Sequence, residues 1–121
     1  MSKKVLVVDD SATVRQQVGA ALKQAGFDIT EAVDGMDGKS KIDTGGFSCV
    51  ICDVNMPNMN GIEMVESVKS DARHSSLPIV MLTTESAKDL ITRAKSAGAA
   101  GWIIKPFKAD MLIAAVEKLA A

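Results

Sequence analysis

The sequence predicts an α/β fold in which five helices cover a doubly wound, five-stranded parallel sheet. Short apolar runs alternate with stretches whose apolar residues recur at helical spacing, which is the pattern of βαβ units. Four of these runs are almost wholly apolar, as expected of strands buried between helices on both faces. Right-handed crossovers leave few topologies for such units, and we expect the flavodoxin-like strand order 2-1-3-4-5.

The amino-terminal half contains two strand–helix units. Residues 5–8 form an apolar strand, and Ser11 is placed to cap the helix that follows it. Gly26 ends that helix at the usual place for a left-handed cap. A weaker strand over residues 28–32 precedes a short polar helix that begins near Gly35 and ends before the glycine pair at 45–46.

The second half contains three further units. Residues 49–52 form a strand, a loop of turn formers covers residues 55–61, and a helix with a buried stripe follows. The fourth strand covers residues 79–82, and Ser86 with Asp89 resembles a capping box that opens the fourth helix. Gly98 and Gly101 frame the turn into a strand over 102–104, before a last helix with an apolar face.

The bulk composition indicates a globular domain. We expect residues 1–121 to form a single domain with no output domain, because the last predicted helix ends within a few residues of the end of the sequence. The chain is 47% apolar and 24% charged, and its net charge of −1 argues against a nucleic-acid surface. No apolar run reaches the roughly 18 residues of a membrane span, and the amino end is too short for a signal peptide. We therefore expect a cytoplasmic protein, and no feature specific to a dimer argues against a monomer.

For the two cysteines and the one histidine, we expect no redox or metal-binding role. Cys49 and Cys52 have the C-x-x-C spacing of a redox pair or half a metal site. Residues three apart on a strand point to opposite faces, however, so we expect two separate core residues. His74 lies in a polar loop, where we expect a solvated side chain and not a ligand.

Polar groups follow four of the apolar runs and should meet at the carboxyl edge of the sheet, where open α/β sheets bind ligands. Asp9, Asp10 and Asp53 follow two runs, while Thr83 and Lys105 follow two others. Two carboxylates about 4 Å apart repel by roughly 4 kcal/mol at an effective dielectric constant near 20, so three need a cation or protons. An all-oxygen donor set favours Mg²⁺. Taken alone, the pair at 9–10 is also consistent with a solvated turn.

Asp53 is the candidate nucleophile, because a carboxylate beside a cation and a lysine is the arrangement of aspartyl-phosphate chemistry. Lys105 and the hydroxyl of Thr83 would then contact phosphoryl oxygens. The bond between Lys105 and Pro106 can be cis at a small energetic cost, which would turn the lysine back over the site. An ordinary proline at the end of a strand is the alternative.

Four segments together resemble the response-regulator receiver domains, most closely the stand-alone chemotaxis regulators. They are Val-Leu-Val-Val-Asp-Asp-Ser at 5–11, Asp-Val-Asn-Met-Pro-Asn-Met-Asn-Gly at 53–61, Leu-Thr-Thr-Glu at 82–85 and Ile-Lys-Pro-Phe at 104–107. The resemblance implies that Asp53 accepts phosphate from a phosphohistidine on a sensor histidine kinase. It implies that Mg²⁺ is bound by Asp10, Asp53 and the backbone carbonyl of Asn55, with Asp9 assisting through water. It also implies that Thr83 and Lys105 contact the phosphoryl group.

The resemblance further implies a switch that ends on an output face. Trp102 stands where the family usually has Tyr or Phe, which is a departure in size and in donor position. Asn55 and Glu85 match the two positions that tune dephosphorylation. The output face would be formed by the fourth helix, fifth strand and fifth helix, with residues Lys88, Ile91, Lys95, Trp102 and Lys108.

That face suits an acidic, apolar helix from a partner. In chemotaxis the partner is the flagellar motor switch protein, and a phosphatase is a possible second partner. The protein would catalyse only its own phosphorylation and dephosphorylation.

Three alternatives keep part of this interpretation. A phosphorelay intermediate or a phosphate sink would use the same chemistry in a different circuit. A haloacid-dehalogenase-type phosphohydrolase also uses a strand-end aspartate and Mg²⁺, but its second acid would fall at Asn55, which has no ionisable proton. A flavin-binding module would need flanking aromatic residues and a phosphate loop after the first strand, and the sequence offers neither.

Overall fold

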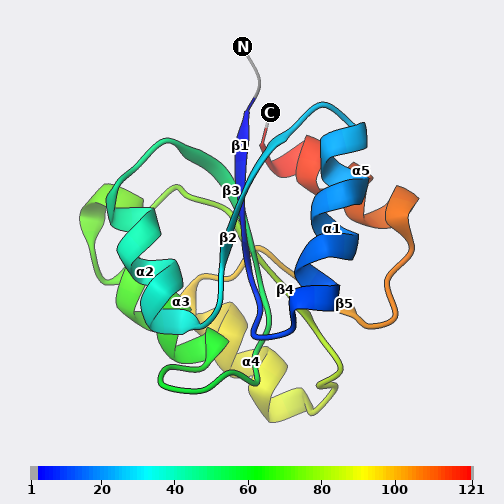
Figure 1. Ribbon diagram of the computed structural model, residues 1–121. Coiled ribbons are helices and arrows are strands. Elements are labelled where there is room, and N and C mark those ends of the chain that lie inside the picture. The colour runs from blue at the N-terminus through cyan, green and yellow to red at the C-terminus, as the bar shows by residue number, and fades with distance from the viewer. Residues whose placement is uncertain (1–2, 121) are drawn as a thin grey trace.

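A computed structural model describes residues 3–120 and confirms the predicted α/β architecture (Figure 1). The five parallel strands have the order β2-β1-β3-β4-β5. The strands are β1 Lys4–Val8, β2 Asp28–Ala32, β3 Phe47–Cys52, β4 Ile79–Thr83 and β5 Gly101–Ile104. The helices are α1 Ala12–Gln24, α2 Gly35–Asp43, α3 Gly61–Lys69, α4 Lys88–Ala97 and α5 Ala109–Leu119, with a 3₁₀ turn, η1, at Ala72–His74.

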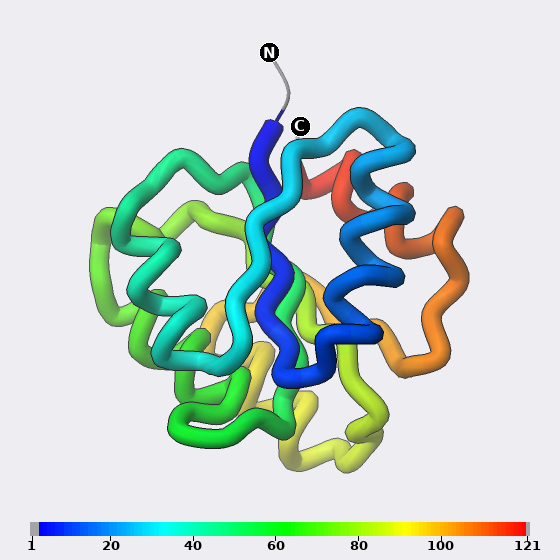
Figure 2. The backbone as a smooth tube through the Cα atoms, in the orientation of Figure 1, coloured from blue at the N-terminus to red at the C-terminus, as the bar shows by residue number. Residues whose placement is uncertain are grey.

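The sheet separates two hydrophobic cores. Helices α1 and α5 cover one face and α2, α3 and α4 cover the other, as the ribbon and the backbone tube both show (Figures 1 and 2). Cys49 lies in the core beneath α1 and α5, whereas Cys52 lies in the other core. Both thiols are free, and burial raises the pKa of Cys49 to about 11 and that of Cys52 still further. The prediction of two separate core residues is therefore confirmed.

The helix ends agree with the sequence at some positions and differ at others. The hydroxyl of Ser11 accepts a hydrogen bond from Val14 N at 3.3 Å, as predicted for the cap of α1. Gly26 and Gly98 have the left-handed φ angles of +99° and +111°. Gly101, expected in a turn, is instead the first residue of β5.

The capping box predicted at Ser86 and Asp89 is wrong. Helix α4 begins at Lys88 with Ala87 as its N-cap, and no side chain caps it. The reason lies one residue earlier, because Glu85 is held by hydrogen bonds through its N–H, its carbonyl and its carboxylate. A capping box does exist at α3, where Asn60 and Glu63 exchange hydrogen bonds of 2.9 and 3.1 Å.

His74 is packed and not solvated, which corrects the sequence-based expectation. Turn η1 folds it against the end of α2, so its side chain is only 11% exposed and its Nε2 lies 3.0 Å from Asp43 Oδ1. Asp43, Asp71 and His74 have donor atoms close enough to share a cation. The Arg73 guanidinium already contacts Asp71 at 2.6 Å and Asp43 at 3.5 Å, so an ion-pair network accounts for this cluster.

The strand register brings the predicted site residues to one edge of the sheet. Val8 at the end of β1 pairs with Cys52 at the end of β3, and Cys52 pairs with Met81 in β4. Thr83 pairs with Ile104 at the ends of β4 and β5. The residues that follow these strand ends therefore lie at the same carboxyl edge.

Within residues 3–120, no helix has both the length and the apolar character that crossing a membrane requires.

The loop after β3 returns close to the strand end because residue 61 has no side chain. Gly61 N donates to Val54 O at 2.9 Å, and a Cβ on Gly61 would lie only 1.8 Å from the carbonyl oxygen of Asp53. Backbone atoms cannot move aside as a flexible side chain can. The close approach therefore requires glycine.

Gly61→Ala should lower the free energy of unfolding by roughly 3 kcal/mol, because the loop must move away from Asp53. Gly19→Ala is the matched control. Its new Cβ would meet Ile29 at 3.5 Å, an ordinary contact, and alanine favours a helix interior by about 1 kcal/mol. In urea unfolding, the free energy of unfolding should be lower than wild type for Gly61→Ala and higher than wild type for Gly19→Ala. Equal stability of Gly61→Ala and wild type would contradict the packing argument.

Candidate functional site

Three carboxylates meet where β1 and β3 end. Asp9, Asp10 and Asp53 each offer an oxygen within 4.8 Å of those of the others. Asp9 is 3% exposed and Asp53 is 8% exposed, whereas Asp10 is open to solvent. Burial raises the pKa of Asp9, and the nearby charge of Asp53 adds to that effect. The fold therefore holds acidic groups close together despite their mutual repulsion.

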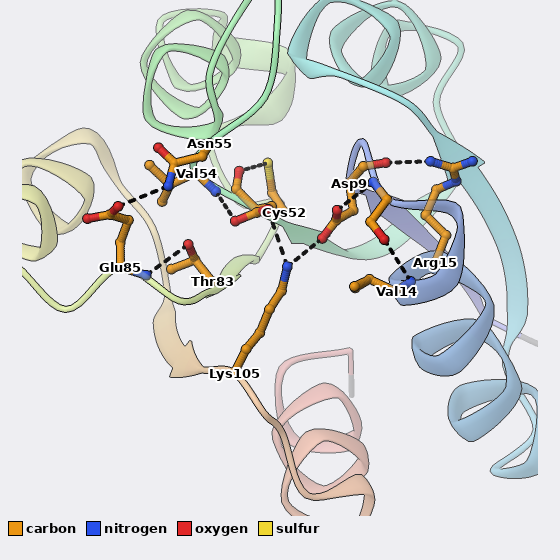
Figure 3. A network of polar contacts seen from close by, with 11 residues as sticks. Asp9, Val14, Arg15, Cys52, Val54, Asn55, Thr83, Glu85 and Lys105 are labelled. Carbon is orange, nitrogen blue, oxygen red and sulfur yellow. Dashed lines mark hydrogen bonds and ion pairs between the residues drawn. The ribbon is translucent and has the colours of Figure 1, made fainter.

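Lys105 supplies the positive charge inside this cluster (Figure 3). Its Nζ lies 2.9 Å from Asp9 Oδ2 and 3.3 Å from Asp53 Oδ2. The peptide bond between Lys105 and Pro106 is cis, and Lys105 N donates to Thr83 O at 2.9 Å. Burial acts to lower the pKa of Lys105, but the two carboxylates outweigh it and raise that pKa overall. The lysine is therefore a fixed cation at neutral pH.

Backbone groups hold the two buried carboxylates in place. Asp9 Oδ1 accepts from Ser11 N at 2.9 Å, and Asp53 Oδ1 accepts from Val54 N at 2.7 Å. Arg15 was not foreseen: its Nη1 donates to the carbonyl of Asp9 at 2.6 Å (Figure 3). Its Nε pairs with Glu31 at 2.9 Å. Arg15 lies one turn into α1, four residues after its cap, and no sequence pattern indicates a contact from there back to the strand end.

The donor set fits Mg²⁺, the cation that the sequence predicts. Each of the three converging side chains offers carboxylate oxygens, the ligand type that this hard cation prefers. Lys105 balances one of the three negative charges, which leaves an excess that a divalent cation would neutralise. The thiol of Cys52 contacts the backbone carbonyl of Asp53 at 3.2 Å and lies in the hydrophobic core.

Glu85 connects three of the other predicted site residues. Its N–H donates to Thr83 Oγ1 at 3.2 Å, and its carboxylate accepts from Asn55 Nδ2 at 3.0 Å (Figure 3). Its carbonyl accepts from Trp102 Nε1 at 2.9 Å. Thr83 itself is fully buried. The loop after β4 thus joins the edge of the acidic cluster to the tryptophan on β5.

The residues predicted to form the output face lie on both sides of β5. Ile91, Lys95 and Trp102 line a small hollow of about 60 Å³ between α4 and β5. Trp102 and Lys108 line a larger hollow of about 360 Å³ between β5 and α5, beside the exposed Ile104 and Met111. Lys88 is exposed in the first turn of α4.

Comparison with known proteins matches residues 5–117 to the response regulator receiver domain. The chain is 38% identical over 117 residues to the chemotaxis protein CheY of Pseudomonas aeruginosa, covering 96% of this chain and 94% of the relative. It is 41% identical over 111 residues to the chemotaxis protein CheY1 of Helicobacter pylori, covering 90% of each. The structure of CheY4 from Vibrio cholerae matches with a TM-score of 0.92 and 38% identity, over 98% of this chain and 99% of that one.

These matches agree with the geometry of the site. Receiver domains of this family generally bind Mg²⁺, and the acidic cluster occupies the expected edge of the sheet. CheY-like domains are signalling proteins and not conventional enzymes. The chain therefore belongs to the response regulator receiver domains, of the CheY type found in two-component systems.

Proposed function

We propose that this receiver domain is switched by phosphorylation of Asp53, with phosphate supplied by a phosphohistidine on a chemotaxis-type sensor histidine kinase. The observation that carries the proposal is the contact of Lys105 Nζ with both Asp9 and Asp53 inside a cluster of three carboxylates. Such a site combines a nucleophile, a fixed cation and an excess of negative charge that a metal ion can neutralise.

In the proposed reaction, an oxygen–phosphorus bond forms at the Asp53 carboxylate while the phosphorus–nitrogen bond of the phosphohistidine breaks. The electron pair of that bond returns to the imidazole. Val54 N–H holds Asp53 Oδ1, and Lys105 faces Oδ2, so the carboxylate is oriented before the donor arrives. Bound Mg²⁺, held by Asp10, Asp53 and the carbonyl of Asn55 with Asp9 acting through water, would offset charge on the transferring group.

The proposed switch runs from Thr83 to the output face. A phosphoryl group that draws the Thr83 hydroxyl toward itself would lengthen the 3.2 Å hydrogen bond that this hydroxyl accepts from Glu85 N–H. Glu85 also holds Trp102 and Asn55. A change at Thr83 would therefore alter both β5 and the dephosphorylation-tuning pair formed by Asn55 and Glu85.

The proposed partner is the flagellar motor switch protein, since the relatives at 38–41% identity are chemotaxis proteins. The apolar hollows beside Trp102 are edged by Lys95 and Lys108, which suits an acidic, apolar helix. We expect a cytoplasmic monomer that a phosphatase can also engage and that binds no nucleic acid. A phosphorelay or phosphate-sink role would use the same site without binding the motor switch.

A phosphohydrolase of the haloacid-dehalogenase type is disfavoured by Asn55. That chemistry needs an acid two residues after the nucleophile, and here an amide occupies the position. The amide is bonded to Glu85 and has no ionisable proton.

Asp53→Asn should abolish phosphorylation while leaving the fold intact, because an amide cannot attack phosphorus as a carboxylate does. The wild type with Mg²⁺ and a small acyl-phosphate donor should gain the mass of one phosphoryl group, and Trp102 fluorescence should change with it. Asp110→Asn, on the exposed first turn of α5, is the control. A hydroxylamine-labile phosphoryl adduct on Asp53→Asn would contradict the assignment.

Lys105→Ala should retain some phosphoryl acceptance but lose the fluorescence response of Trp102, because the lysine links the modified carboxylate to the loop before α5. Intact mass and fluorescence, recorded on the same sample, separate the two effects. Lys118→Ala, in the last turn of α5, controls for the loss of a lysine. A normal fluorescence response from phosphorylated Lys105→Ala would argue against a coupling role.

Asp9→Asn should raise the free energy of unfolding at neutral pH without Mg²⁺, because burial makes the ionised form of Asp9 unfavourable in the folded protein. The folded-state pKa of Asp9 is raised, so the folded protein binds that proton more tightly than the unfolded chain does. Wild-type stability should therefore fall as the pH rises from about 4 through the raised pKa, and the variant should lack this loss. Urea unfolding in EDTA at a series of pH values measures the difference in free energy of unfolding between the two proteins. An Asp9→Asn variant that is less stable than the wild type at neutral pH would contradict this prediction.

A further inference from the structure

The loop between β3 and α3 is braced against the amino end of α2. This loop, residues 53–60, carries Asp53 and Asn55. At its tip, Asn58 Nδ2 donates to Asp34 Oδ2 at 2.7 Å. In the other direction, Gly35 N donates to the carbonyl of Met59 at 3.1 Å. Two hydrogen bonds thus join segments more than twenty residues apart.

The fit at this contact is close. A Cβ on Gly35 would lie 2.4 Å from the carbonyl oxygen of Met59, so only glycine permits the approach. Asn58 has a φ of +68°, a left-handed conformation that asparagine tolerates better than most residues. The residue types at 35 and 58 therefore match the two special backbone requirements of the contact.

The acceptor in this contact is itself fixed. Asp34 is the N-cap of α2, with its Oδ1 accepting from Asp37 N at 2.8 Å, and the residue is only 9% exposed. Hydrogen bonds from the backbone N–H of Asp37 and from the side-chain amide of Asn58 both lower the pKa of Asp34. Asp37 Oδ2 in turn accepts from Val33 N at 3.0 Å. The hydrogen bond from Asp37 N therefore orients the Asp34 carboxylate from within α2, in addition to the bond from the loop.

We propose that Asp34 and Asn58 are positioning residues for the magnesium site. The loop is already closed at its base by Gly61 N and Val54 O. The bond between Asp34 and Asn58 fixes its tip, so the backbone between them, which carries Asn55, is held at both ends. Mg²⁺ demands near-ideal octahedral geometry, and contacts that orient its ligands typically change its affinity 10- to 100-fold. This inference rests on the proposed function, which places the Asn55 carbonyl among the ligands.

Asn58→Gly is the direct test. Glycine adopts the same left-handed backbone without strain and removes only the donor to Asp34, so the cap of α2 remains. The dissociation constant for Mg²⁺ alone, measured by calorimetry without a phosphoryl donor, should rise about 10-fold. Thermal unfolding in EDTA would confirm that the variant is folded.

Two further variants separate positioning from general loosening. Asp34→Ser keeps an N-cap but loses the bond to Asn58, so it should weaken Mg²⁺ binding similarly, and the double variant should lose little more. Asn60→Gly deletes an asparagine side chain two residues after Asn58 and leaves the Asp34 contact intact. It should bind Mg²⁺ as the wild type does.

Each outcome has a separate meaning. Weak binding by Asn58→Gly and Asp34→Ser with normal binding by Asn60→Gly supports the inference. Wild-type affinity in folded Asn58→Gly and Asp34→Ser, or equal losses in all three variants, would overturn it and leave the proposed function standing. A wild-type protein that binds no Mg²⁺ would overturn both.

Discussion

The contact of one ammonium group with two buried carboxylates is the interaction on which the rest of this site depends. Lys105 lies between Asp9 and Asp53, and Asp10 adds a third acid at the same edge. Two carboxylates about 4 Å apart repel by roughly 4 kcal/mol at an effective dielectric constant near 20. Three acids against one lysine leave two uncompensated negative charges. The fold thus holds an excess of negative charge that a bound divalent cation would neutralise.

This excess negative charge is maintained because the backbone, and not the side chains alone, sets the positions of the three acids. Ser11 N and Val54 N each hold one carboxylate, and the strand register aligns the strand ends that precede them. The glycine at position 61 brings α3 against the carbonyl of Asp53. Relaxation of the repulsion would therefore require breaking strand pairs or opening a close-packed loop. The strand pairs and the packed loop together therefore offset the repulsion between the carboxylates.

The sequence was sufficient to predict the sheet, its order and the residues at its carboxyl edge. Apolar runs define strands, and a group that directly follows a strand has little freedom to lie elsewhere, so Asp9, Asp53 and Lys105 were predictable. Contacts between distant segments were not predictable. The expected capping box at Ser86 is absent because long-range bonds at Glu85 fix the preceding chain, and such bonds leave no periodic trace in the sequence.

The same limit applies to His74 and to the contact between Asp34 and Asn58. His74 lies in a polar stretch that resembles an exposed loop, yet the turn places it against Asp43, thirty-one residues earlier in the chain. Asn58 lies in the predicted loop of turn formers, and only the structure shows that it bonds to Asp34. In each case local composition did not reveal the partner, because the packing of α2 sets which residue the side chain contacts.

Glu85 determines how a change at the acidic edge can reach the surface. Its amide, carboxylate and carbonyl bond to Thr83, Asn55 and Trp102, so one short loop holds the threonine, the loop after β3 and the β5 indole. The indole N–H is the donor that phenylalanine would lack at this position. Because α4 begins three residues later without a side-chain cap, its first turn is weakly held. In the proposed switch, a displaced Thr83 would therefore act on α4 and Trp102 together, through backbone atoms they both depend on.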